Sequence, residues 1–160
     1  MQHTTNRYFT ISYLLILGIV IGASVYAGAI VAPVTFNSQN WLGSELLSRF
    51  QEGLIMTQNF VGLGYFIVAG IFAIFIYEGY QYKRFNRDLL KTLSALGAIM
   101  SGALFKYFYM SAIIDMQKQG SSIVNDKIFN NMHIGSEIAL VLFSIFVIIL
   151  FTKTLLKELK

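Results

Sequence analysis

Four long apolar stretches separated by short polar segments dominate the chain. They cover residues 9–36, 54–78, 92–114 and 134–153. A helix needs about 20 predominantly apolar residues to cross the hydrocarbon core of a bilayer, and each stretch is long enough. A helix of a soluble bundle shows a polar stripe, but only Ser144 interrupts the apolar run Ile138–Phe151. The pattern predicts an all-α fold, a four-transmembrane-helix bundle that forms a single integral membrane domain over residues 1–160.

Basic residues gather on one side of this predicted topology. Eight of the twelve lie before the first span, between the second and third spans, or after the fourth: Arg7, Lys83, Arg84, Arg87, Lys91, Lys153, Lys157 and Lys160. Because Lys and Arg concentrate in cytoplasmic loops, we expect both termini in the cytoplasm and a location in the cell (inner) membrane. The net charge of +4 follows from this asymmetry, so we expect no nucleic-acid partner. Glu78, beside the basic loop, is assigned to surface electrostatics.

Composition removes several classes of protein. Apolar residues make up 56% of the chain and charged residues 12%, against about 45–50% and about 25% in a soluble domain. The absence of cysteine excludes disulfide frameworks, iron–sulfur clusters and thiol catalysis. The chain has neither a phosphate-binding loop of the GxxxxGK type nor a GxSxG nucleophile elbow. An enzymatic function is therefore the less favoured expectation.

The segment between the first two spans has a pattern of its own. Pro33 lies near the end of the first span, where proline tends to end or kink a helix. Ser44 is placed to cap a helix that runs to Glu52, with Glu45 and Arg49 paired four residues apart. We predict a short interfacial helix here, on the outer surface of the membrane. Alternatively, the segment continues directly into the second span as one helix of about 55 Å, which is longer than the bilayer is thick.

Small residues recur at helical spacing in two of the spans. Gly18 and Gly22 form a GxxxG pair in the first span, and Ser94, Ala98 and Gly102 repeat at intervals of four in the third. Within lipid, helices associate through close packing, which small residues permit. These stripes indicate either packing inside the bundle or contact with a second copy of the chain in a homo-oligomer.

Six polar side chains at or near membrane depth are candidates for a functional site. They are Glu52 just before the second span, Gln58 and Asn59 within it, Lys106 of the third, and His133 and Glu137 at the start of the fourth. Ionisable groups at membrane depth are costly and are often functional. Because all six fall toward the outer side, we predict that they line a polar pocket that opens outward and binds a ligand or an ion.

Each of these residues also has a purely structural interpretation. Lys106 can extend its stem and place its ammonium at the outer boundary. Gln58 and Asn59 can hydrogen-bond a neighbouring helix, while His133 and Glu137 can be solvated where their helix begins. The two interpretations differ for Lys106 and Asn59. In a transporter these side chains face a water-filled cavity, whereas in an assembly subunit they contact a partner or pack dry.

His133 also supports two cofactor hypotheses. Met132 precedes it, and Met56, Met110 and Met116 fall toward the same outer side. Thioether sulfur together with imidazole suits copper(I), although methionine also fills gaps in apolar packing. Haem held by two histidines needs a second histidine at membrane depth, so only haem with a single histidine ligand stays open. Metal binding by His133 and Met132, as copper or haem, is therefore the alternative hypothesis.

Several short motifs resemble one known family. They are Ala32-Pro33-Val34-Thr35-Phe36 at the end of the first span, Leu47-Ser48-Arg49 before the second, and His133 with Ser136, preceded by Phe129, at the fourth. With the four-span pattern, these motifs resemble the membrane proteins of the domain of unknown function 4149, the transmembrane protein 205-like family. The resemblance implies a four-helix integral membrane protein and no established reaction. The family often has a small residue after that serine, and Glu137 departs from this pattern.

Together these features predict a non-enzymatic integral membrane protein. We expect it to act as a subunit of a membrane assembly or as a small transporter-like unit with an outward polar site. Copper or haem handling is the alternative function. The expected partners are the lipid bilayer, other membrane subunits or a second copy of the chain.

Overall fold

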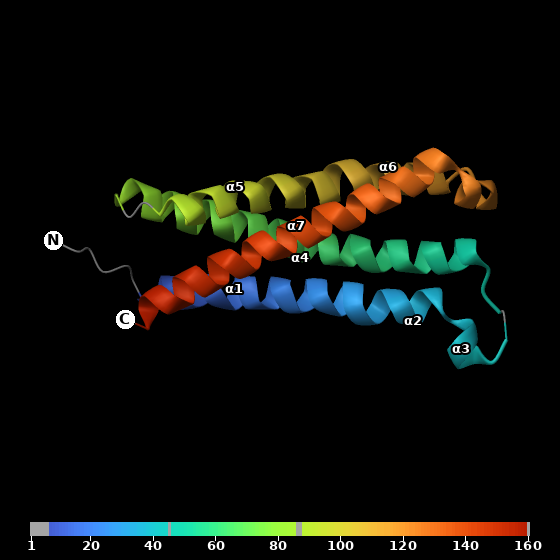
Figure 1. The fold of residues 1–160 in the computed structure, drawn as a ribbon, viewed down its shortest axis with the longest axis horizontal. Helices are drawn as coiled ribbons and strands as arrows, with labels where there is room; N and C mark the ends of the chain where they lie inside the picture. The colour runs from blue at the N-terminus through green and yellow to red at the C-terminus, as the bar shows by residue number, and fades with distance from the viewer. Residues whose placement is uncertain (1–6, 45, 86–87, 160) are drawn as a thin grey trace.

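Four long helical segments form an antiparallel bundle in the computed structural model, which describes residues 7–44, 46–85 and 88–159 (Figure 1). In chain order, the segments are α1 (Arg7–Tyr26), π-helical η1 (Ala27–Val31) and α2 (Ala32–Phe36); α4 (Arg49–Lys83); α5 (Leu89–Ala103), π-helical η2 (Leu104–Tyr109) and α6 (Met110–Gln117); and α7 (Lys127–Glu158). Two short helices lie in the connections, α3 (Gln39–Leu42) and the 3₁₀ turn η3 (Ser121–Asn125). The described residues contain no strand, which confirms the predicted all-α bundle.

Each of the four segments is long and apolar enough to cross a membrane. The chain is thus a multi-pass membrane protein, and its longest helix, α4, has 35 residues, or about 52 Å at 1.5 Å per residue. The start of α1 and the end of α7 lie at the same end of the bundle (Figure 1). We call it the basic end, because its described helix ends carry Arg7, Lys83, Arg84, Lys91, Lys153 and Lys157. The opposite end, with α3 and η3, is the distal end.

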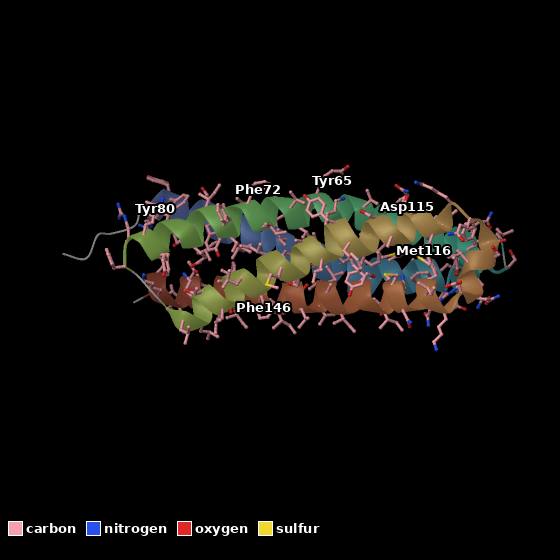
Figure 2. All side chains as sticks on the ribbon, turned by 90° about the horizontal axis from the view of Figure 1, so that it is seen from above. Tyr65, Phe72, Tyr80, Asp115, Met116 and Phe146 are labelled. Carbon is pink, nitrogen blue, oxygen red and sulfur yellow. The ribbon has the colours of Figure 1, made fainter. Side chains whose placement is uncertain are left out.

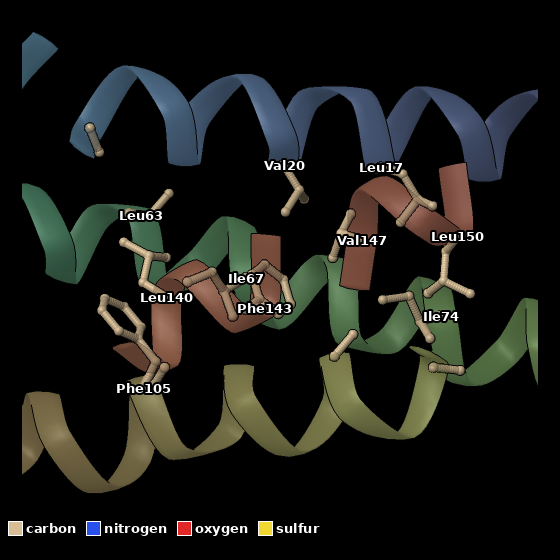
Figure 3. Close-up of a cluster of buried hydrophobic side chains, with 14 of the residues drawn as sticks. Leu17, Val20, Leu63, Ile67, Ile74, Phe105, Leu140, Phe143, Val147 and Leu150 are labelled. Atoms are coloured by element: carbon tan, nitrogen blue, oxygen red, sulfur yellow. The ribbon is translucent and has the colours of Figure 1, made fainter. Parts of the chain in front are cut away.

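The middle of the bundle is filled by large apolar side chains from all four segments (Figure 3). Leu17 of α1, Ile67 and Ile74 of α4, and Phe143 and Val147 of α7 are each 0% exposed. The helix α7 crosses the bundle diagonally, from beside α6 at the distal end to beside α1 at the basic end (Figure 1). Along this crossing, α7 contributes buried residues from Ser136 to Thr154.

Glycines let large side chains approach the backbone of a neighbouring helix. A Cβ atom on Gly102 of α5 would lie 2.9 Å from the ring of Phe143 and 3.0 Å from Ile67. Gly102 belongs to the stripe with Ser94 and Ala98, which is buried inside the bundle. Such close approach supplies the packing that holds helices together in lipid. By contrast, Gly18 and Gly22 lie on the exposed face of α1.

The connection between α2 and α4 differs from the sequence prediction. Pro33 does not end the first helical segment, because the wider π-helical turn η1 precedes it and the chain stays helical to Phe36. The predicted helix start at Ser44 is wrong, and α4 instead begins after Ser48. There Ser48 accepts a hydrogen bond from the backbone of Gln51, whose side chain bonds back to the Ser48 N–H, forming a capping box. The predicted Glu45–Arg49 pair lies outside the described residues.

Two matched glycine-to-alanine substitutions test this packing, because they should change the free energy of unfolding in different ways. We expect Gly102→Ala to lower the free energy of unfolding by about 1–3 kcal/mol, because the new methyl group overlaps Phe143 and Ile67. The same change at Gly62 of α4, where a Cβ would meet no atom within 4 Å, should leave stability unchanged or raise it by up to about 1 kcal/mol. Thermal unfolding in detergent measures both, and equal effects of the two substitutions would contradict the packing described here.

Candidate functional site

A cavity of about 270 Å³ opens at the distal end of the bundle. We call it the distal cavity. Its polar lining residues are Arg49 and Thr57 of α4, Gln117 of α6, and Asn130, His133 and Glu137 of α7; its apolar ones include Phe36, Phe50, Val124 and Phe129. Two of the six residues predicted from the sequence, His133 and Glu137, therefore lie on one cavity wall. The polar residues Arg49, Thr57, Gln117 and Asn130 were not predicted.

The inner wall of the distal cavity is a hydrogen-bonded pair that joins two helices. Gln117 Nε2 of α6 donates to Thr57 Oγ1 of α4 at 2.9 Å. The Thr57 hydroxyl donates in turn to the carbonyl of Gly53 at 2.8 Å. Both side chains are buried, at 8% and 6% exposed for Gln117 and Thr57. Buried polar groups need partners, and this pair places a fixed amide and hydroxyl beside the cavity.

Glu52 does not line the distal cavity but fixes one side of it. It is 6% exposed, and its Oε1 accepts a hydrogen bond from the Ser38 hydroxyl at 2.6 Å. Its Oε2 pairs with Arg49 Nη1 at 3.3 Å, and the same Nη1 donates to the carbonyl of Phe36 at 3.0 Å. The Arg49 guanidinium also lies 4.4 Å from the centre of the Phe36 ring. Glu52 thus ties the connecting loop to α4 and holds Arg49 at the cavity.

His133 and Glu137 face each other one turn apart on α7. His133 Nε2 lies 3.4 Å from Glu137 Oε1, with the two side chains 31% and 61% exposed. The Phe36 ring lies nearly perpendicular to the imidazole, with the ring centres 6.3 Å apart. Ser136 does not cap a helix here, since its hydroxyl donates to the carbonyl of His133 inside α7. The N-cap of α7 is Asp126, seven residues before His133.

Gln58 and Asn59 lie apart from the distal cavity. Both are exposed on the outer face of α4. The Asn59 amide donates to the carbonyl of Ile55 in its own helix at 3.1 Å. On the same helix, Glu52 and Met56 are buried, whereas Asn59 is exposed. Gln58 and Asn59 therefore do not share a pocket with His133 and Glu137.

Lys106 also lies away from the distal cavity, across the surface of α4. Its stem passes over Gly64, where a Cβ atom would come within 2.6 Å of Lys106 Cδ. The ammonium reaches the carbonyl of Val61 at 3.5 Å and lies 4.6 Å from the centre of the Tyr65 ring. Tyr65 itself points away from the bundle (Figure 2). A carbonyl and an aromatic face accommodate this cation.

The copper and haem hypotheses depend on the surroundings of His133 and of the methionines. Met56 and Met110 are buried in packing, at 1% and 3% exposed, and Met132 is half-buried beside His133. Within the described part of the chain, no group of three or more His, Cys, Asp or Glu side chains is placed to hold a metal. Metal binding by His133 and Met132 stays a prediction.

A second polar network lies at the basic end, and the sequence did not predict it. Lys91 Nζ of α5 pairs with Glu78 Oε1 of α4 at 3.1 Å, and the two side chains are only 10% and 12% exposed. The hydroxyl of Tyr13 in α1 donates to the same Oε1 at 3.0 Å. The assignment of Glu78 to surface electrostatics is therefore wrong. One carboxylate joins three helices, and removing either charge would leave the other buried without its partner.

Tyr77 extends this network toward α1. Its ring stacks on that of Tyr13 with the centres 4.0 Å apart. Its hydroxyl accepts a hydrogen bond from Gln81 Nε2 at 2.9 Å and shares another with Thr10 Oγ1 at 3.1 Å. Tyr77 is 1% exposed, so these bonds satisfy its hydroxyl inside the bundle.

Comparison with known proteins identifies the family to which the chain belongs. The profile of DUF4149, a domain of unknown function, matches residues 15–122. The chain belongs to this DUF4149 family. The matched stretch includes Arg49, Glu52 and Glu78 of α4 and Lys91 of α5, but it ends before α7. No curated protein and no solved structure matches the chain.

The loop attachment at Glu52 gives a local test. We expect Glu52→Ala to lower the free energy of unfolding by about 1.5–3 kcal/mol, because it removes charge-assisted hydrogen bonds to Ser38 and Arg49. Hydrogen exchange of the backbone amides in α3 should also become faster. As a control, Asp115→Asn breaks the exposed pair with Lys118 and should change stability by less than about 0.5 kcal/mol. Unchanged exchange in α3 would show that Glu52 does not hold the loop.

Asp88, just before α5, gives a test by pH. A hydrogen bond from the backbone N–H of Lys91 and the ammonium of Lys153 hold the pKa of Asp88 below its ordinary value. A lowered folded pKa stabilises the protein above the unfolded value of about 3.9, and this contribution disappears as pH falls through the folded pKa. We expect the stability difference between wild type and Asp88→Asn to shrink over that acidic range. A difference that grows on acidification would contradict the assignment.

Proposed function

We propose that this member of the DUF4149 family is a non-enzymatic membrane protein that binds a small polar ligand with an anionic group in the distal cavity. The observation that carries the proposal is the convergence of polar side chains from α4, α6 and α7 on one cavity of about 270 Å³. Pockets that combine apolar walls with a few convergent polar groups are the usual form of a ligand site. Here Phe36 and Phe129 supply apolar walls beside the polar groups.

The size and charge of the distal cavity favour a small anion-bearing molecule. Drug-sized ligands occupy pockets of about 300–1,000 Å³, so a cavity of about 270 Å³ suits a smaller molecule rather than a porphyrin. Arginine carries five N–H donors, and only Nη1 of Arg49 is used in its bonds to Phe36 and Glu52. The remaining donors of Arg49, with the imidazole of His133, suit a carboxylate or a phosphate.

The packing of the bundle supports a binding or assembly role rather than conduction. The core residues between the distal cavity and the basic end, such as Ile67 and Phe143, are 0% exposed. Neither Lys106 nor Asn59 lines the distal cavity, whereas a transporter-like unit was expected to place both in water. We therefore infer that the ligand binds from one side, and that the protein acts as a subunit with other membrane proteins or with a second copy.

The charge distribution supports a topology for this proposal. Basic residues favour the cytoplasmic side of a membrane, and six of them lie at the described helix ends of the basic end, namely Arg7, Lys83, Arg84, Lys91, Lys153 and Lys157. We infer that both termini are cytoplasmic, that the protein resides in the cell (inner) membrane, and that the distal cavity opens to the outside.

Thermal unfolding in detergent, recorded against a panel of small carboxylates, phosphates and neutral polyols, tests the proposal. At least one anionic compound should raise the unfolding midpoint of the wild type. Arg49→Gln and His133→Gln should each weaken binding roughly 10- to 100-fold, the effect of losing a hydrogen bond to a charged group. Lys118→Gln, at the same end but in an exposed ion pair outside the cavity, should bind like the wild type. Stabilisation by polyols alone, or by anions equally in all variants, would contradict the proposal.

A further inference from the structure

A second cavity, of about 190 Å³, lies between α4 and α5 at the basic end. We call it the basic-end groove. Its lining residues are Ile74, Phe75, Glu78, Gly79 and Tyr82 of α4, Asp88, and Lys91, Thr92, Ala95, Leu96 and Ile99 of α5. It shares no lining residue with the distal cavity. The groove therefore needs an explanation that is independent of the proposed ligand site.

The groove opens sideways, on the lipid-facing surface of the bundle. Three of its lining residues, Phe75, Leu96 and Tyr82, are 69%, 55% and 50% exposed. Gly79 provides part of its floor, and a Cβ atom there would meet no other atom within 4 Å. A laterally open apolar groove in a membrane-spanning bundle is in contact with acyl chains rather than with bulk water.

Polarity changes along the groove in the same direction as across a bilayer leaflet. The residues nearer the middle of the helices, Ile74 and Ile99, are apolar, while Glu78 and Lys91 lie near the helix ends. Glu78 is five residues before the end of α4, a rise of about 7.5 Å. The headgroup region of one leaflet is about 5–8 Å thick. Placing the end of α4 at the membrane surface puts the charged part of the groove at headgroup depth and the apolar part at acyl-chain depth.

One carboxylate oxygen in the groove, Oε2 of Glu78, has no hydrogen-bond donor among the described residues. Glu78 uses Oε1 for both Lys91 and Tyr13, and among the described residues no hydrogen bond reaches its Oε2. Asp88, by contrast, accepts the backbone N–H of Lys91 through Oδ1 and pairs with Lys153 through Oδ2. Lys91 contributes an ammonium whose three N–H donors are not all used by Glu78. A carboxylate oxygen and a lysine ammonium are therefore available side by side.

We propose that the basic-end groove binds phosphatidylethanolamine, a zwitterionic phospholipid whose headgroup carries a primary ammonium and no carboxylate. The lipid ammonium donates to Glu78 Oε2, its phosphate accepts from Lys91, and one acyl chain lies along Phe75, Leu96 and Ile99. A zwitterionic headgroup matches a lining that carries both signs of charge. Phosphatidylglycerol lacks the cation that Glu78 requires, and the quaternary ammonium of phosphatidylcholine has no N–H to donate.

Native mass spectrometry tests the proposal on the full-length protein, taken from nanodiscs with equal parts of phosphatidylethanolamine, phosphatidylcholine and phosphatidylglycerol. One ethanolamine lipid should stay bound per chain, enriched roughly tenfold over the other two, the ratio expected from one charge-assisted hydrogen bond. Glu78→Gln should abolish this preference among headgroups. Gly79→Leu, which fills the groove, should remove the bound lipid altogether.

The matched control is Gly62→Leu. Gly62 lies on the same helix as Gly79, and a Cβ atom added there would likewise meet no atom within 4 Å. Unlike Gly79, it does not line the groove. This control variant should retain the ethanolamine lipid, and the unfolding midpoint of each variant reports whether it is folded. Equal retention of all three lipids overturns the headgroup assignment. Retention by Gly79→Leu as strong as by Gly62→Leu overturns the groove as the site. A lipid-free dimer that only Gly79→Leu dissociates would instead make a second copy the occupant.

Discussion

Close packing at glycine is the constraint on which the rest of this structure depends. Lipid gives apolar helices no hydrophobic reason to associate, so cohesion comes from the fit of side chains against neighbouring backbones. Gly102 admits Phe143 and Ile67, and Gly70 admits Val20 of α1 at 3.2 Å from the position of a Cβ. These contacts join α1, α4, α5 and α7 at mid-bundle. They also fill the centre with apolar side chains, so that the buried polar groups left there, at Ser24 and Ser101, are single hydroxyls.

Polar chemistry is consequently divided between the two ends of the bundle. At the distal end, Glu52 secures the loop and the hydrogen bond between Gln117 and Thr57 secures two helices beside an open cavity. At the basic end, the Glu78–Lys91 pair serves the same structural purpose beside a lateral groove. Each end therefore combines a fixed, buried polar contact with an accessible space. This division favours separate binding events at the two surfaces over passage of one substrate between them.

The sequence was sufficient for the elements that depend on local pattern. Unbroken apolar runs predicted four helices. The capping box of Ser48 and Gln51 has the pattern Ser-x-x-Gln before an apolar run, so the start of α4 is also predictable from the sequence. The sequence could not predict which face of each helix turns toward the interior of the bundle, because these spans carry no polar stripe. That is why Asn59 was expected in the pocket while it lies outside.

Cysteine accessibility tests the separation of the two ends most directly, since the chain has no cysteine of its own. Single cysteines would replace Asn130 at the distal cavity, the exposed Leu89 at the basic end and Ala98 in the core, in protein reconstituted in sealed vesicles. With a charged, membrane-impermeant thiol reagent, the first should react from one side of the membrane only and the second from the opposite side only. The cysteine at position 98 should react from neither side. Labelling there would reveal a water-filled passage and contradict a bundle with a dry centre.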